Sequence, residues 1–125
     1  MNRKAFVSGC FDMLHRGHVE FFHEAAQYGD LYVALGSDRT IFELKGRSTI
    51  NGEQERLFMV KSVSLVKDAF ISCGSGILDF EADLREVMPN YFIFNADGHV
   101  SEKRDLGRRE THSRWVRVLA RRASD

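Results

Sequence analysis

Residues 9–18 place two histidines among glycines and an aspartate, in the order Gly-Cys-Phe-Asp-Met-Leu-His-Arg-Gly-His. His15 and His18 are three residues apart, a spacing that puts both imidazoles on one face of a helix start. The first amides of a helix are unpaired and attract anions, so imidazole donors there suit a phosphate group. Gly9 permits a tight turn, and Gly17 lets a ligand approach closely. The segment therefore predicts charge stabilisation on a polyphosphate, without nucleophilic attack by the protein.

The rest of the chain alternates short apolar runs with amphipathic stretches, which predicts the elements that position this segment. We expect strands at 4–8, 31–35, 69–72, 91–94 and 115–119, and helices at 17–28, 51–63 and 77–88. Residues 37–51 are polar and contain glycine, so we expect a loop there. Strands alternating with helices indicate a parallel sheet covered on both faces. We therefore predict an α/β, Rossmann-like three-layer sandwich with about five strands.

In such sheets, ligands bind at the carboxyl ends of the strands. We therefore expect the chemistry in the loops that follow strands, at 9–17, 36–51, 72–76 and 95–101. The helix expected at 51–63 begins with Asn51 and Gln54, which have the spacing of a capping box.

Length and charge limit the classes of function. The 125 residues suffice for one domain with its own core, so we treat 1–125 as a single unit. Eighteen Lys and Arg balance eighteen Asp and Glu, which argues against a protein that mainly binds nucleic acid or an anionic membrane surface. No apolar run is long enough to span a membrane. With only Cys10 and Cys73, we expect a reducing compartment, the cytoplasm.

The ten-residue segment resembles the signature of the cytidylyltransferase-like nucleotidyltransferases, in which G-x-F-D precedes H-x-G-H. Class I aminoacyl-tRNA synthetases carry a similar histidine motif but are far longer. Further stretches resemble the family in the same order, at 29–33, 36–38, 45–47, 53–56 and 95–98. The resemblance covers residues 4–105 and is nearest to small cytidylyltransferases of the glycerol-3-phosphate type. Small adenylyltransferases share its first half.

The resemblance implies that an oxygen of a substrate phosphate attacks the α-phosphorus of a nucleoside triphosphate and that pyrophosphate leaves. It implies CTP, or alternatively ATP, with Mg²⁺, a small phosphorylated substrate and a homodimer. Catalysis would fall to His15, His18 and Lys45. The residues expected at the nucleotide are Gly9, Cys10, Phe11, Asp12, Gly17, Asp38, Asn95, Asp97 and Gly98, and those expected at the substrate are Lys45, Arg47 and Arg56.

Two of these residues have a second interpretation. Asp12 either orients its loop or approaches a metal ion. Arg56 either contacts substrate or forms a structural ion pair. We predict no metal ligands among the side chains, because no zinc-like spacing is present and Mg²⁺ in such sites is bound mainly by phosphates and water.

The last 25 residues differ from the family pattern. The family has a Ser/Thr-rich turn that opens a last helix and closes over the phosphates, whereas here the expected strand is followed by Ala-Arg-Arg-Ala-Ser-Asp. Residues 101–125 carry eight Lys and Arg against four Asp and Glu. Three alternatives follow: the chain is a truncated relative, Arg121, Arg122 and Ser124 replace the turn, or a partner chain completes the site. A domain that binds nucleotide without catalysis is an alternative function. A flavodoxin-like signalling domain with a chance motif is a further alternative.

Overall fold

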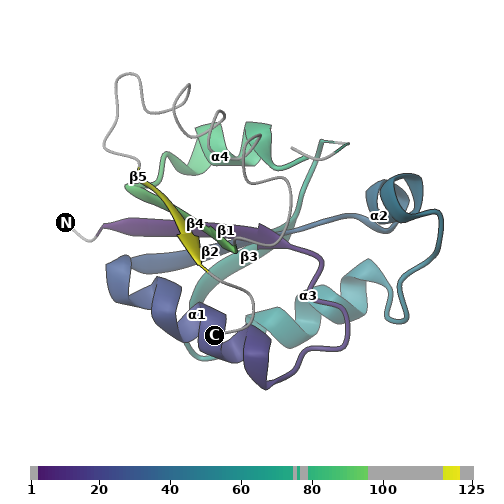
Figure 1. Ribbon diagram of the computed structural model, residues 1–125, viewed down its shortest axis with the longest axis horizontal. Helices are drawn as coiled ribbons and strands as arrows, with labels where there is room; N and C mark the ends of the chain where they lie inside the picture. The colour runs from purple at the N-terminus through teal and green to yellow at the C-terminus, as the bar shows by residue number, and fades with distance from the viewer. Residues whose placement is uncertain (1–2, 75, 77–78, 96–116, 122–125) are drawn as a thin grey trace.

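Five parallel strands form a single sheet in the order β3-β2-β1-β4-β5 (Figure 1). The computed structural model describes residues 3–74, 76, 79–95 and 117–121. The strands are β1 (Lys4–Gly9), β2 (Asp30–Leu35), β3 (Val66–Ile71), β4 (Tyr91–Asn95) and β5 (Arg117–Arg121). The predicted parallel sheet of about five strands is confirmed.

Helices cover both faces of this sheet. They are α1 (Arg16–Ala25), continued by the 3-10 turn η1 (Ala26–Tyr28), then α2 (Asp38–Lys45), α3 (Glu53–Lys61) and α4 (Glu81–Val87). In Figure 1, α1 and α3 lie on one side of the sheet and α4 lies on the other. The predicted three-layer sandwich is therefore confirmed.

Each face of the sheet has its own apolar core, because successive strand residues point to opposite sides. On the α1 and α3 side, Val7 packs in one cluster with Phe22 and Val60. On the α4 side, the ring of Phe6 lies 6.1 Å from that of Phe80, between centroids. Phe6 and Val7 are neighbours on β1 and are buried on opposite faces of the sheet, as expected for a central parallel strand.

The loop predicted at 37–51 is wrong, because it contains α2. Ser37 caps the helix by accepting a hydrogen bond from the Thr40 amide at 3.1 Å. Gly46 follows the last helical residue with φ 70°, the left-handed conformation typical of a helix C-terminus. Both capping signals are present in the sequence, but the polar character of the segment outweighs them in a reading based on hydrophobicity.

The start of α3 also differs from the prediction. Its N-cap is Gly52, which has no side chain to accept a hydrogen bond. The capping box expected between Asn51 and Gln54 is therefore absent, and the backbone of Asn51 is instead hydrogen-bonded to Asp12 and Arg56. In the part of the chain that the structure describes, α4 begins at Glu81, later than the expected residue 77.

The order of the strands locates the expected binding edge. From β1 the chain passes outward through β2 to β3, whereas β4 and β5 lie on the other side of β1. The loops that follow β1 and β4 therefore diverge at the carboxyl edge, and this reversal is where open parallel sheets bind ligands. The predicted loop at 9–17 lies at this edge.

Candidate functional site

The two histidines of the motif cap α1 together. The Nδ1 atom of His15 accepts a hydrogen bond from the Gly17 amide at 3.0 Å. The Nδ1 atom of His18 accepts one from the His15 amide at 3.1 Å. The two rings are stacked with centroids 3.9 Å apart. We call this reciprocal arrangement the histidine cap.

The histidine cap determines which ring nitrogens carry hydrogen. A nitrogen that accepts a hydrogen bond holds no proton, so each neutral ring carries its hydrogen on Nε2. Burial lowers the pKa of His18 below its ordinary value of 6.5, and charge on His15 lowers it further. His18 is therefore neutral at pH 7, with Nε2–H as a donor. Two such donors at the positive N-terminal end of α1 can stabilise a phosphate anion.

Gly17 makes room for the histidine cap itself. A Cβ added at Gly17 would lie 2.9 Å from Cε1 of His15. Gly9 is similarly covered by a ring, since a Cβ there would lie 2.8 Å from Cζ of Phe11. The sequence reading assigned these glycines to ligand approach and to a tight turn. In the structure, their nearest neighbours are side chains of the same loop.

The loop between β1 and α1 is held in a strained conformation. Phe11 and Met13 have positive φ angles of 52° and 50°, a region that costs residues other than glycine free energy and persists where the surroundings enforce it. The Phe11 ring packs edge-on against both Phe22 and His18, at 4.9 and 5.5 Å between centroids. The apolar core thereby fixes the position of the histidine cap.

Asp12 joins this loop to the segment before α3. Its carboxylate accepts hydrogen bonds from the amides of Ile50 at 2.7 Å and Asn51 at 2.9 Å. Burial alone would raise the pKa of Asp12, but these amides and the charge of Arg56 outweigh it, so the pKa lies below the ordinary 3.8. Of the two predicted roles, these contacts match the one in which Asp12 orients the loop.

Arg56 is buried and bonded entirely to protein. Its side chain is 0% exposed. Its guanidinium donates to the carbonyl oxygens of Cys10 and Gly36, both at 2.9 Å, and of Asn51 at 3.1 Å. It also pairs with Asp38 at 2.8 Å. These contacts, which we call the Arg56 clamp, join the carboxyl ends of β1 and β2 to α2 and α3.

Asp38 completes the clamp and is likewise occupied. Besides Arg56, its carboxylate accepts hydrogen bonds from Thr49 at 3.2 Å and from the Glu53 amide at 3.1 Å. Burial would raise the pKa of Asp38, but these bonds outweigh it, Arg56 foremost, and the pKa lies below 3.8. Of its two predicted roles, Arg56 thus matches the structural ion pair, and its partner is Asp38, a residue predicted at the nucleotide, whose side chain is 48% exposed.

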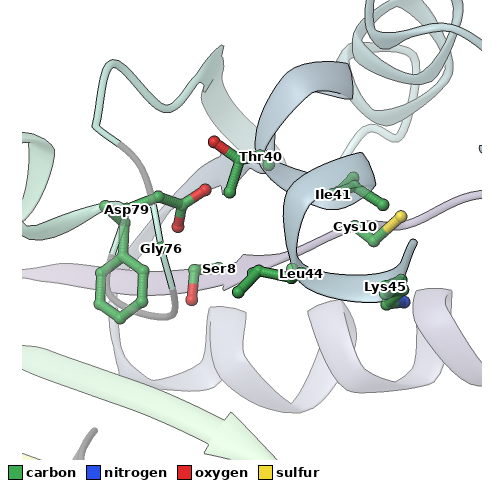
Figure 2. A pocket seen from close by; sticks show the side chains of 11 residues that line it. Ser8, Cys10, Thr40, Ile41, Leu44, Lys45, Gly76 and Asp79 are labelled. Carbon is green, nitrogen blue, oxygen red and sulfur yellow. The ribbon is translucent and has the colours of Figure 1, made fainter. Parts of the chain in front are cut away.

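A pocket opens at the carboxyl edge between β1, α2 and the segment before α4 (Figure 2). Its volume is about 210 Å³. Lys45 lies on one side and Asp79 on the other, with the side chains of Ser8 and Leu44 between them. The lining residues are Ser8, Gly9, Cys10, Gly36, Thr40, Ile41, Leu44, Lys45, Gly76, Asp79 and Phe80.

The predicted site residues thus fall into separate groups. Gly9, Cys10 and Lys45 line the pocket. His15 and His18 form the histidine cap, with Phe11 and Gly17 packed against it, and Asp38 and Arg56 form the clamp. Lys45 is the last residue of α2, not part of a loop. Arg47 is exposed. Asn95 ends β4, and Asp97, Gly98, Arg122 and Ser124 lie outside the described residues.

The sequence reading missed several pocket residues. Thr40, Ile41 and Leu44 follow the three- and four-residue spacing of a helix face. This spacing was not used, because the polar composition of residues 37–51 predicted a loop. Asp79 and Phe80 were placed inside the helix expected at 77–88, whereas they precede α4. No local pattern marks an aspartate that only the fold brings opposite Lys45.

Two further features, a membrane-spanning helix and a cluster of metal-binding side chains, are absent from the described residues. None of the described helices combines the length and the hydropathy needed to cross a bilayer. In the same part of the chain, no group of three or more His, Cys, Asp or Glu side chains is placed to hold a metal ion. Cys10 and Cys73 are both free thiols.

Known proteins of similar sequence identify the family of this chain. The cytidylyltransferase-like family model matches residues 6–121. The bifunctional protein HldE of Helicobacter acinonychis is 36% identical over 99 residues, which are 74% of this chain and 20% of HldE. The FAD synthase of Methanobrevibacter smithii is 34% identical over 76% of this chain and 63% of its own length. For the FAD synthase of Methanopyrus kandleri, the identity is 33%, over 82% of this chain and 69% of that protein.

A solved structure supports the fold. A lipopolysaccharide core biosynthesis protein from Thermoplasma volcanium superposes with a TM-score of 0.78, at 21% identity, over 96% of both chains. The chain spans one fifth of the HldE protein and about 63% of the first of the two FAD synthases. The family model covers nearly all of it, and HldE and the FAD synthases belong to the same nucleotidyltransferase superfamily with the H-x-G-H motif. The chain therefore belongs to the cytidylyltransferase-like family.

Proposed function

We propose that this protein transfers a nucleotidyl group from a nucleoside triphosphate to the phosphate of a small substrate. The observation that carries the proposal is the histidine cap, which leaves Nε2–H of His15 and His18 as donors at a helix N-terminus. A neutral donor held in place before the reaction begins is a means of stabilising charge that develops in a transition state.

The reaction needs no covalent bond to the protein. An oxygen of the acceptor phosphate attacks the α-phosphorus, the bond to the bridging oxygen breaks, and its electron pair leaves with pyrophosphate. The protein contributes position and charge, as in phosphoryl transfer generally. His15 and His18 donate to the triphosphate, and the amides that open α1 add partial positive charge.

Lys45 serves the acceptor side in this proposal. It ends α2 at the wall of the pocket, and its side chain is exposed. No hydrogen bond or ion pair to another described residue occupies its ammonium, in contrast to Arg56. Lys45 can therefore pair with a phosphate. Arg47, exposed two residues further along, can add to this positive charge.

We propose that Mg²⁺ accompanies the triphosphate. The fit is to a metal bound by phosphates and water, because the described side chains offer no ready cluster and Asp12 already accepts two backbone amides. When bound, the ion would neutralise part of the negative charge of the phosphates.

CTP is the proposed donor, on the strength of the cytidylyltransferase-like family model. ATP is the second candidate, because the relatives include FAD synthases, which are adenylyltransferases of the same superfamily. Asp97 and Gly98, which are expected at the nucleotide, lie outside the described residues. The choice between CTP and ATP therefore requires an experiment.

That experiment is calorimetric titration of CTP and ATP in parallel with Mg²⁺, followed by pyrophosphate release with glycerol phosphate, phosphocholine and phosphoethanolamine. Binding of CTP alone supports cytidylyl transfer, and binding of ATP alone redirects the assay to sugar phosphates and flavin. Binding without turnover with any acceptor would support a non-catalytic nucleotide-binding domain. The absence of binding by either triphosphate would contradict the proposal.

We also propose that the protein acts as a homodimer in the cytoplasm. Phe42, Ile50 and Phe58 expose 54%, 71% and 68% of their surface, and exposed large apolar residues favour burial against another protein surface. Sedimentation equilibrium tests this pairing, with a dimer mass expected and a monomer mass contradicting it.

A further inference from the structure

We propose that Phe11 is a positioning residue for the reaction, because its ring holds the His18 imidazole in the orientation that the histidine cap requires. The side chain of Phe11 acts through His18 in this role and needs no contact with nucleotide or substrate. The inference rests on the proposed function, since it explains how one of the two proposed donors is kept in place.

Contacts on both sides hold the backbone of Phe11. On one side, the carbonyl oxygen of Cys10 accepts a hydrogen bond from Arg56 at 2.9 Å. On the other side, the carboxylate of Asp12 accepts hydrogen bonds from two backbone amides before α3. The φ angle of Phe11 is 52°, a value that a residue with a Cβ adopts only where its surroundings enforce it. The two anchored neighbours provide that enforcement and direct the side chain of Phe11.

The ring of Phe11 is enclosed by the core and by the end of β1. Phe11 is only 7% exposed, and its ring lies 4.9 Å from that of Phe22, between centroids. The tip of the ring lies over Gly9, since a Cβ there would be 2.8 Å from Cζ and 2.9 Å from Cε2. A ring packed at the density of a protein interior has little freedom to move. The missing side chain at Gly9 is therefore what allows Phe11 its position.

This fixed ring contacts one histidine of the cap. It meets the His18 imidazole at an interplanar angle of 87°, with 5.5 Å between centroids, an arrangement that aromatic pairs favour. Within the described residues, no such ring contact joins Phe11 to His15. The ring of His15 instead occupies the space that a Cβ at Gly17 would need. The two histidines are therefore positioned by different neighbours, His18 by Phe11 and His15 by the room at Gly17.

A fixed imidazole keeps the two nitrogens of His18 in their separate roles. Nδ1 accepts a hydrogen bond from the His15 amide at 3.1 Å, and a half-turn of the ring would put a carbon in its place and redirect Nε2–H. Burial lowers the pKa of His18, and charge on His15 lowers it further. An apolar ring beside the imidazole contributes to that burial, so it keeps Nδ1 unprotonated and able to accept. Loss of the Phe11 ring should release both constraints.

The test is NMR of the free full-length chain, in which coupling across hydrogen bonds connects backbone amides with imidazole nitrogens. In Phe11→Leu, we expect the coupling between the His15 amide and Nδ1 of His18 to disappear. The coupling between the Gly17 amide and Nδ1 of His15 should remain. The pKa of His18 should rise toward its ordinary value of 6.5, because water reaches the imidazole.

Two further variants separate this effect from a general disturbance of the core. Phe21→Leu is the matched control, because Phe21 is buried in the same cluster and its ring lies 6.4 Å from that of Phe22. It should leave both couplings intact. Gly9→Ala keeps the Phe11 ring but places a Cβ where the tip of the ring lies, so we expect it to remove the His18 coupling as Phe11→Leu does. This variant also answers the case in which Phe11→Leu fails to fold.

Pyrophosphate release gives a second readout. At pH 7, we expect Phe11→Leu to lower the rate about tenfold, as for a moderate loss of positioning. Because a protonated Nδ1 cannot accept, a raised pKa of His18 should make the loss of activity on acidification begin at a higher pH than in the wild type. Phe21→Leu should keep the wild-type acid limb, since a purely structural role in the core does not change the titration of His18.

Three outcomes would overturn the inference. They are a His18 coupling that persists in both Phe11→Leu and Gly9→Ala, an equal loss of that coupling in Phe21→Leu, and an acid limb that Phe11→Leu leaves unchanged. These outcomes are distinct from failure of the proposed function, because the couplings are measured without nucleotide. The proposed function fails if neither triphosphate binds, whatever the couplings show.

Discussion

The histidine cap and the Arg56 clamp both join segments at the carboxyl edge of the sheet, but they use their polar groups differently. The Nδ1 atom of each histidine accepts a hydrogen bond from a backbone amide, which leaves Nε2–H available for another partner. Arg56 is fully enclosed, and its side chain bonds three carbonyls and one carboxylate. A motif residue can contact ligand only if part of its hydrogen-bonding capacity is left over. This criterion separates site residues from scaffold residues that the sequence places side by side.

The largest expected effect comes from removing the free donor of the histidine cap. In His18→Asn, the side-chain oxygen can still accept from the His15 amide, but no group replaces Nε2–H. We expect pyrophosphate release to fall at least about a hundredfold, as for the loss of one preorganised donor, with thermal stability nearly unchanged.

The control for that variant lies on the same helix. His23 is exposed on α1, so His23→Asn should leave the rate within about twofold, as is usual for surface substitutions. If the two variants lost activity equally, Nε2 of His18 would have no special role.

The clamp should instead affect stability. Arg56→Met leaves three carbonyls and Asp38 without their donor, and we expect a loss of about 3 kcal/mol in the free energy of unfolding. Arg39→Met is the matched control, because Arg39 pairs with Glu43 at 3.7 Å on the surface and should cost about 0.5 kcal/mol or less. Urea denaturation measures both. Equal losses for the two variants would mean that the buried contacts add nothing.

A substitution at Gly17 should disturb the histidine cap without a large change in stability. In Gly17→Ala, the new Cβ would meet the His15 ring, so we expect His15 to turn away and the rate to fall about tenfold, a moderate loss of positioning. Helix propensity favours alanine by up to about 1 kcal/mol, so the stability should not fall greatly. Imidazole NMR signals report the ring. Weaker nucleotide binding with an unmoved His15 ring would restore the reading in which Gly17 contacts ligand.

The smallest effects concern two carboxyl groups with opposite pKa shifts. The pKa of Asp38 is lowered, so its contribution to stability is present above 3.8 and is lost as the pH falls through the folded value. Burial raises the pKa of Asp83, followed by repulsion from Glu86, despite hydrogen bonds from Cys73. Its ionisation therefore destabilises the fold as the pH rises.

Two asparagine variants test these signs. Asp38→Asn should destabilise at pH 7 and flatten the loss of stability below pH 3.8, whereas Asp83→Asn should stabilise slightly at pH 7. Urea midpoints between pH 3 and 7 measure both. The same direction of change at pH 7 in the two variants would contradict the assigned environments.

The strands and the motif could be predicted from local sequence. Fully apolar runs such as Leu31–Leu35 indicate buried parallel strands, and the strand, loop and helix around His15 follow from spacing and glycine. α2 was missed because its two cap residues, Ser37 and Gly46, were weighed less than its polarity. Burial of a charged side chain is a tertiary property, so the enclosure of Arg56 had no local signal.

The pocket was predictable only in part for the same reason. Gly9, Cys10 and Lys45 belong to motif segments, and the fold brings them to one wall. Asp79 joins them through the connection from β3 to α4, which no spacing rule specifies. Sequence patterns report which residues share an element, whereas the sheet order determines which elements meet.

Long-range proton–nitrogen NMR of the histidine rings, with and without CTP and Mg²⁺, tests the central claim most directly. We predict that His15 and His18 both carry hydrogen on Nε2 at pH 7. Addition of the triphosphate should shift their Nε2 signals and leave those of exposed His23 unchanged. The same titration with ATP tests the alternative nucleoside triphosphate. Hydrogen on Nδ1 of either residue, or Nε2 signals that respond to neither triphosphate, would contradict the account.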